Sequence, residues 1–203
     1  MFDAEDPTIY LPQYLTELDQ KKLLRQIDQY TRNPGPLYSN GFQEPGLIYQ
    51  GDGIDELLVV SLPSLETVNK ASLILSNSCD INPTNPRFIP QNLVYAPLVD
   101  FEKLSNFLLE TFPDREAGVR DHLRELQKQY VTNAFYLPVG TSNKLDQPKV
   151  AYFDHVISLP PSELQHDDVE GKRLFSLSDL GFYLFVFKLS IHFTRVREDV
   201  ARG

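Results

Sequence analysis

The residues most able to do chemistry lie in one short polar run that directly follows an apolar segment. This run contains Ser76, Asn77, Cys79 and Asp80. Small polar side chains just after a buried strand often line the mouth of a site, so Ser76 and Asn77 are candidate ligand-binding residues and Asp80 is a candidate for proton transfer. Cys79 is a candidate nucleophile if a histidine, such as His155, lies close enough to generate its thiolate. A structural reading also fits, because a free cysteine is commonly a small core residue and Asp80 opens a sequence suited to a turn.

A second group of polar residues lies in the apolar C-terminal segment. Lys188, His192 and Arg195 are spaced i, i+4 and i+7, which on a helix places them on one face. Such a cationic stripe could meet a phosphate or a partner's carboxylates, which makes His192 a candidate for catalysis and the other two candidates for ligand binding. The alternative is an ordinary solvated face of an otherwise apolar helix. If the segment is a strand, Arg195 points away from the other two.

Other chemical signatures are not found in the sequence. It has no phosphate-binding glycine loop, no zinc-type spacing of cysteine and histidine, and no Gly-x-Ser-x-Gly nucleophile elbow. Its scattered histidines do not form a metal-binding pattern. We therefore predict neither a metal site nor a cofactor.

Two apolar segments, 70–76 and 92–99, resemble the paired core strands of the MazF/PemK toxin family. In that family a basic residue and a proline precede an apolar strand that ends in serine, and a later strand ends in Pro-Leu-Thr. Here the first segment reads Lys-Ala-Ser-Leu-Ile-Leu-Ser and the second ends in Pro-Leu-Val. Three further segments are similar in order and spacing to the family's final strands and terminal helix: 135–138, 150–160 and 177–180. The resemblance covers residues 46–195, with a helical insertion at 101–130.

The resemblance implies an α+β protein with a small antiparallel SH3-like β-barrel, usually a homodimer, and metal-independent cleavage of single-stranded RNA. In such enzymes an arginine stabilises the charge on the phosphate, and a threonine assists at the same phosphate. The matching positions here hold Lys70 and Val99. Lysine supplies positive charge without the bidentate fork of arginine, and valine cannot donate a hydrogen bond. The family's catalytic pattern is therefore incomplete.

Three functions follow from these residues. The first is an endoribonuclease or RNA-binding protein in which Lys70 neutralises the scissile phosphate, with Cys79, Asp80 or the cationic stripe contributing proton transfer or positioning. The second is a non-catalytic interaction module that kept the barrel and binds a protein partner, such as an antitoxin or a second copy of the chain. The third is a cysteine-dependent enzyme that uses Cys79.

The N-terminal residues are predicted to form a helical arm. Apolar residues between positions 11 and 30 recur close to helical spacing among lysine, glutamine and aspartate. The Asn-Pro-Gly-Pro run at 33–36 breaks any helix, because proline removes a backbone donor and biases its predecessor toward extended backbone. We therefore divide the chain into an arm with its linker at 1–40, which could dock a partner, and a barrel domain at 41–203.

The elements that must position the candidate residues alternate between strand and helix patterns. Short segments rich in β-branched residues predict antiparallel strands at 56–62, 71–76, 92–98, 134–138 and 150–159. Helical spacing predicts helices at 101–112 and 115–129, with Asp114 as the cap between them. The length of the final apolar segment favours a helix at 178–199, with Ser176 as the first residue of a capping box, although its residues also alternate as in a strand.

Composition limits the class of protein. At 203 residues and 41% apolar content, the chain can bury one core without disulfides, and its single cysteine cannot form one within the chain. The net charge of −9 opposes nonspecific attraction to nucleic acid, although a local basic groove remains open. The N-terminus lacks the layout of a signal peptide, and the apolar stretch 180–193 is shorter than the roughly 18 residues of a membrane span. We therefore predict a cytoplasmic protein that does not enter a membrane.

Overall fold

The structure is a computed structural model that describes residue 25 and residues 36–41, 44, 46–61, 63–85, 88–89, 91–160 and 169–194. The predicted helical arm at 11–30 lies outside the described residues except for Arg25. Arg195 and the end of the predicted helix at 178–199 also lie outside them.

Seven β-strands form an antiparallel sheet, as the sequence predicts for the strand-rich parts of the chain. They are β1 Gly53–Ser61, β2 Glu66–Ile74, β3 Leu93–Asp100, β4 Ala134–Leu137, β5 Lys149–Tyr152, β6 Ile157–Leu159 and β7 Arg173–Phe175. Their order is β4-β5-β3-β2-β1-β7, and β6 also pairs with β3. Within the described residues no ladder joins β4 to β7, so the sheet is open and closure into an SH3-like barrel stays a prediction. The fold class is therefore α+β, built on an antiparallel sheet.

The predicted strand at 150–159 is two short strands that both pair with β3. Leu98 pairs with Ala151 in β5, and Leu93 pairs with Leu159 in β6. Between these two pairs the β5–β6 segment contains more residues than β3, so the extra residues form a turn between β5 and β6. Extra residues on one strand of a pair bend the sheet and increase its twist. The predicted strand was therefore right in position and wrong in continuity.

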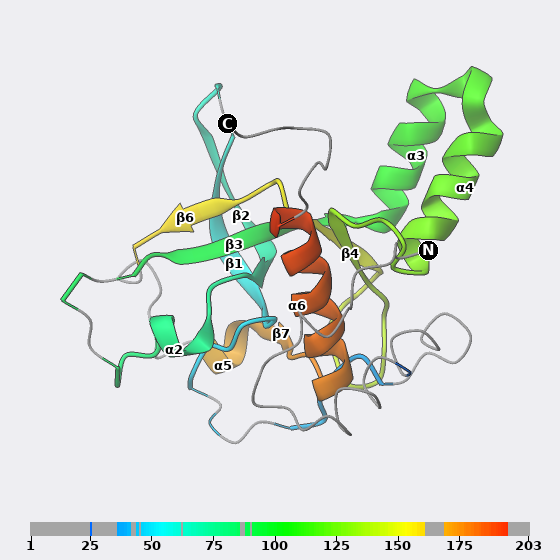
Figure 1. Ribbon diagram of the computed structural model, residues 1–203. Helices are drawn as coiled ribbons and strands as arrows, with labels where there is room; N and C mark the ends of the chain where they lie inside the picture. The colour runs from blue at the N-terminus through cyan, green and yellow to red at the C-terminus, as the bar shows by residue number, and fades with distance from the viewer. Residues whose placement is uncertain are drawn as a thin grey trace, which may run out of the picture.

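The described α-helices are α2 Ser78–Ile81, α3 Phe101–Thr111, α4 Glu116–Gln127, α5 Val169–Lys172 and α6 Asp179–Thr194. Helices α3 and α4 form a hairpin at one end of the sheet (Figure 1), at the position of the predicted helical insertion, and Leu126 of α4 packs with Ala134 of β4 and Val150 of β5. The predicted cap at Asp114 is wrong. Asp114 lies in the 3-10 turn Pro113–Arg115, and α4 begins after Arg115 without a side-chain cap. The proline starts this tight turn because its fixed φ suits the first position of a helical turn.

Helix α6 confirms the helix that the length of the C-terminal apolar segment favours, and it crosses one face of the sheet (Figure 1). Phe185 is fully buried, and its ring contacts the rings of Phe135 and Phe153 at centroid distances of 5.6 and 5.9 Å. Apolar side chains occupy more than one face of a buried helix, which explains why the same segment also alternates like a strand. None of the described helices is long and apolar enough to cross a membrane.

The start of α6 differs from the predicted capping box. Ser178, rather than Ser176, supplies the oxygen that accepts from the backbone N–H of Gly181, at 3.1 Å. The Ser178 hydroxyl also donates to the carbonyl of Pro36, so the first turn of α6 is joined to the segment that precedes the sheet. The Ser176 hydroxyl donates instead to the carboxylate of Asp52.

The position of Lys188 shows that the predicted cationic stripe is wrong at this residue. Its side chain is buried, with 3% exposure, and its Nζ lies 2.8 Å from Gln129 Oε1 and 5.7 Å from the centre of the Phe135 ring. His192, one turn later, contacts the rings of Phe153 and Phe193. Lys188 therefore belongs to neither a solvated face nor a phosphate-binding face.

Gln129 connects Lys188 to the terminal strand of the sheet. Its Nε2 donates to the carbonyl of Tyr136 at 2.6 Å, and its Oε1 accepts from the N–H of the same residue at 3.2 Å. Gln129 has a φ of 64°, a left-handed conformation that is uncommon for residues other than glycine. This turn after α4 places the Gln129 side chain beside Tyr136 of β4, where Lys188 of α6 contacts it.

The buried amine predicts a specific dependence of stability on pH. Desolvation lowers the pKa of Lys188 from 10.5 to about 7. Between these two values the unfolded chain binds more protons than the folded protein, so the free energy of unfolding should rise with pH, by up to about 1.4 kcal/mol per pH unit. Urea unfolding from pH 6 to 10 measures this slope, and Lys188→Met should remove most of it.

Lys103→Met is the matched control, because the Lys103 side chain is 80% exposed. This variant should keep the native slope. Equal slopes in the native protein and in Lys188→Met would contradict a neutral buried amine at this position.

Candidate functional site

A cleft of about 320 Å³ brings the polar run after β2 next to the C-terminal part of α6. We call it the amide cleft. Its lining residues are Leu75, Ser76, Asn77, Asp80, Gln91, Asn92, Val94, Val156, Leu189 and Phe193. Three predicted site residues, Ser76, Asn77 and Asp80, therefore line one cavity. The sequence located this wall of the cleft but not the residues that face it from β3 and α6.

The end of β2 holds the polar run against the start of β3. Leu75 and Ser76 both donate backbone N–H groups to the carbonyl of Val94, at 2.8 and 3.1 Å. The Ser76 hydroxyl accepts from the N–H of Val94 at 2.7 Å and donates to the carbonyl of Asn92 at 3.3 Å. Ser76 therefore extends the strand pairing with its side chain, which sets the direction of the residues that follow.

Asn77 turns the chain from β2 into α2. Its Oδ1 accepts from the N–H of Cys79 at 2.9 Å, the interaction that caps the first turn of a helix. The cap leaves Cys79 exposed and Asp80 on the wall of the cleft. The turn predicted to open at Asp80 begins later: Asp80 lies in the short helix α2, and the turn follows it, where the N–H of Asn85 donates to the carbonyl of Asn82 at 3.0 Å.

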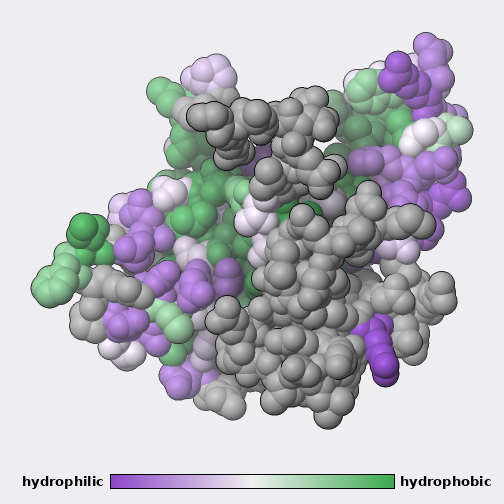
Figure 2. Space-filling model, in the orientation of Figure 1, coloured by the Kyte–Doolittle hydropathy of each residue, from purple (hydrophilic) through white to green (hydrophobic). Residues whose placement is uncertain are grey.

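The lining combines amide groups with apolar side chains. Asn77, Gln91 and Asn92 supply amides, and Asp80 is the one carboxylate among the described lining residues. On the opposite wall Val156 is 42% exposed and Phe193 is 61% exposed. Figure 2 shows this mixture as apolar surface over β3 and β6 with polar surface beside it. No lysine or arginine lines the cleft within the part of the chain that the structure describes.

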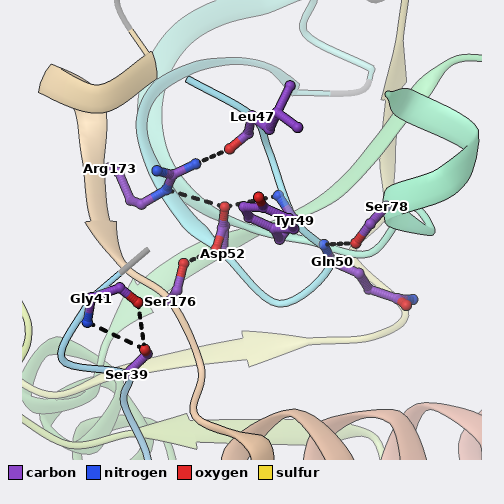
Figure 3. A network of polar contacts seen from close by, with 9 residues as sticks. All are labelled: Ser39, Gly41, Leu47, Tyr49, Gln50, Asp52, Ser78, Arg173 and Ser176. Carbon is purple, nitrogen blue, oxygen red and sulfur yellow. Dashed lines mark hydrogen bonds and ion pairs between the residues drawn. The ribbon is translucent and has the colours of Figure 1, made fainter. Parts of the chain in front are cut away.

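A buried polar network lies behind the polar run (Figure 3). Asp52, 1% exposed, accepts from Arg173 Nε at 3.1 Å and from the N–H of Tyr49 at 2.9 Å, and its other oxygen accepts from the Ser176 hydroxyl. Arg173, 3% exposed, also donates to the carbonyl of Leu47. Burial raises the pKa of the Asp52 carboxyl, and the charge of Arg173 and the hydrogen bonds oppose that rise.

Gln50 connects this network to the polar run on the wall of the cleft. Its N–H donates to the Ser78 hydroxyl at 2.9 Å, and its Nε2 donates to the carbonyl of Leu75 at 2.8 Å. Gln50 lies two residues before Asp52, so the loop that the ion pair holds also bonds the residue before the polar run and a residue within it. Asp52 and Arg173 thus act as positioning residues for the cleft wall.

The predicted catalytic residues do not come together. Lys70 is exposed on β2, opposite Leu57, and does not line the amide cleft. His155, the histidine proposed to activate Cys79, lies against the ring of Tyr152 at a centroid distance of 5.3 Å. No hydrogen bond joins Cys79 to a histidine among the described residues. The described residues also contain no cluster of three or more His, Cys, Asp or Glu side chains that could hold a metal ion.

Comparison of the sequence with models of protein families and with curated proteins gave no match.

The buried ion pair predicts a large loss of stability when one partner is removed. Arg173→Met leaves the Asp52 carboxylate buried without its cation, and should lower the free energy of unfolding by about 3–5 kcal/mol. Arg120→Met is the control, because Arg120 pairs with Glu116 at 2.6 Å on an exposed helix surface and its loss should cost no more than about 1 kcal/mol. Chemical unfolding measures both. Similar small losses in the two variants would show that the buried pair does not organise the fold.

Proposed function

We propose that this protein is a non-catalytic interaction module whose amide cleft binds an extended segment of a partner protein. The observation that carries the proposal is the lining of the cleft. Asn77, Gln91 and Asn92 place amide groups in the lining. Asn77 Oδ1 caps α2 and Asn92 Nδ2 donates to Ser158 at 3.0 Å, so the Asn77 Nδ2 and Asn92 Oδ1 atoms are the ones that can pair with the peptide groups of a ligand. Val156 and Phe193 present apolar surface beside them. Extended peptides are recognised in this way, with main-chain hydrogen bonds for affinity and pockets for alternate side chains.

The distribution of charge supports a protein partner over RNA. Phosphate recognition relies on lysine and arginine, and the described lining of the cleft has neither, while Lys188 is buried. Asp80 on the wall and the net charge of −9 favour a partner segment with positive charge. A second copy of the chain in this role would make the protein a homodimer, which sedimentation analysis would detect.

We further propose that the domain is a divergent relative of the MazF/PemK family that kept the sheet and lost the phosphate chemistry. In support, the last pair of the β2–β3 ladder is Ser72 with Pro97, and two residues further along each strand stand Lys70 and Val99. These are the two positions at which the family carries its catalytic arginine and threonine. A valine there cannot donate a hydrogen bond to a phosphate.

The first test of the proposal is peptide binding with matched variants. A display library of random nonapeptides selects ligands for the native protein, and fluorescence anisotropy measures their affinities. Phe193→Ala should weaken the selected peptides by about tenfold, because buried aromatic anchors dominate such interfaces. Val156→Ala should weaken them by a smaller factor.

Two control variants match these residues in exposure outside the cleft. Phe107 on α3 is 61% exposed, as is Phe193, and Val68 on β2 is 42% exposed, as is Val156. Phe107→Ala and Val68→Ala should leave the affinities unchanged. Peptides that respond to the control variants and not to the cleft variants would place the binding surface elsewhere.

The second test asks whether the protein cleaves RNA. A mixed pool of single-stranded RNA incubated with the protein in EDTA should remain intact on a gel, because Lys70 does not line the cleft that holds Asp80. The Lys70→Ala variant serves as the comparison. Cleavage by the native protein that is absent with Lys70→Ala would replace the interaction module with a metal-independent ribonuclease.

A further inference from the structure

A second cavity, of about 300 Å³, lies on the other side of the polar run from the amide cleft. We call it the serine cavity. Its lining residues are Ser39, Gly41, Tyr49, Gln50, Asp52, Ser78, Ser176, Leu177 and Phe182. In Figure 3, Tyr49 and Ser176 lie next to the buried carboxylate of Asp52. Ser78 belongs to this cavity and its neighbour Asn77 to the amide cleft, so the two sites share one wall.

Two serine hydroxyls of this cavity are set up to accept hydrogen bonds. The Ser176 hydroxyl donates its proton to Asp52, and the Ser39 hydroxyl donates its proton to the carbonyl of Gly41 at 2.8 Å. A serine hydroxyl has one proton and two acceptor lone pairs. With both protons already used, and one Ser39 lone pair accepting the N–H of Gly41 at 3.4 Å, Ser39 and Ser176 can offer a ligand only their remaining lone pairs, so these two groups favour a hydrogen-bond donor.

The electrostatic environment also favours a cation. Asp52 lies at the floor of the cavity, whereas Arg173, which pairs with it, is not among the lining residues. At Tyr49 on the wall, burial raises the pKa of the phenol, and the negative charges of Glu44 and Asp52 raise it further, against an opposing effect of Arg173. The rings of Tyr49 and Phe182 add π faces, which attract cations.

We infer that the serine cavity binds a primary ammonium group. A primary ammonium has three N–H donors and no acceptor, which matches the Ser39 and Ser176 hydroxyls, whose protons are already donated, and the Asp52 carboxylate in the same lining. A neutral alcohol of the same size would bind more weakly, because it has a single donor and no charge.

The source of the ammonium, on the basis of the proposed function, is a lysine side chain of the segment that occupies the amide cleft. Phe182 lines the serine cavity and Leu189 lines the amide cleft, and seven residues of helix span about 10 Å. An extended peptide covers that distance in about three residues. The partner segment therefore carries an apolar residue and a lysine three positions apart.

The ammonium site is tested first without any peptide. n-Butylammonium chloride is titrated into the full chain, and the ring resonances of Tyr49 and Phe182 are followed by NMR, with n-butanol as the uncharged probe. We expect a saturable shift with butylammonium and at least about tenfold weaker binding of butanol, since hydrogen bonds to charged groups are the stronger kind. No saturable shift, or equal binding of the two probes, would overturn the ammonium site.

Serine variants then show that the probe occupies the cavity. Ser39→Ala removes an acceptor without touching the Asp52–Arg173 pair, and it should weaken butylammonium severalfold while the melting temperature stays close to native. Ser64→Ala, in the turn between β1 and β2, is the control and should have no effect. Equal effects of the two variants would overturn the assignment to the serine cavity.

A third experiment, with peptides, tests whether the bound ammonium belongs to a lysine side chain or to a free amine. Peptides that bind the amide cleft are synthesised with lysine or with norleucine three positions from the apolar anchor. The lysine form should bind about tenfold more tightly, and Ser39→Ala should remove the difference. Equal affinities would overturn the lysine assignment. Failure of every peptide to bind would count against the interaction module, whereas the butylammonium titration would still decide the ammonium site.

Discussion

The buried ion pair between Asp52 and Arg173 is the contact on which the arrangement of both cavities depends. It joins the loop before β1 to β7, two segments that are separated by 121 positions. A charge removed from water is stable only when its partner and its hydrogen bonds are all in place, so this contact forms in one geometry. Gln50 connects that loop to Leu75, just before the polar run, and to Ser78 within it. Buried side chains thereby set the position of residues that line a surface cleft. Asp52 and Arg173 do this without any need to contact a ligand themselves.

Sequence patterns were reliable where the physics is local. Strand and helix periodicity placed β3, β4, α3 and α4 to within a few residues, and the length of the last apolar segment correctly favoured α6 as a helix. The caps at Asp114 and Ser176 were wrong because several polar residues near a helix start can serve, and tertiary partners decide among them. Lys188 had the spacing of a surface stripe, but Gln129 and Phe135 surround it in the core. No local pattern reports such a partner.

The candidate site was predictable in part for the same reason. Ser76, Asn77 and Asp80 were identifiable because small polar residues after an apolar strand mark a change of direction at the surface. The facing wall comes from Asn92 and Phe193, which the sheet register and the path of α6 bring to the same cleft. The pairing of Asp52 with Arg173 could not be predicted from spacing, because the two residues are 121 positions apart in the sequence. Convergence of this kind is a property of the fold, and the sequence shows only its separate parts.

The side chain of Gln129 has a consequence for the solubility of the protein. Strand β4 ends the sheet, and an exposed terminal strand is a template on which a strand of another molecule can add, leading to aggregation. By bonding both the N–H and the carbonyl of Tyr136, Gln129 imitates a neighbouring strand for one residue. The N–H and the carbonyl of Tyr136 are therefore not available to an incoming strand of another molecule. A single amide, held by a lysine from the core, thus closes this point of the edge to intermolecular sheet growth.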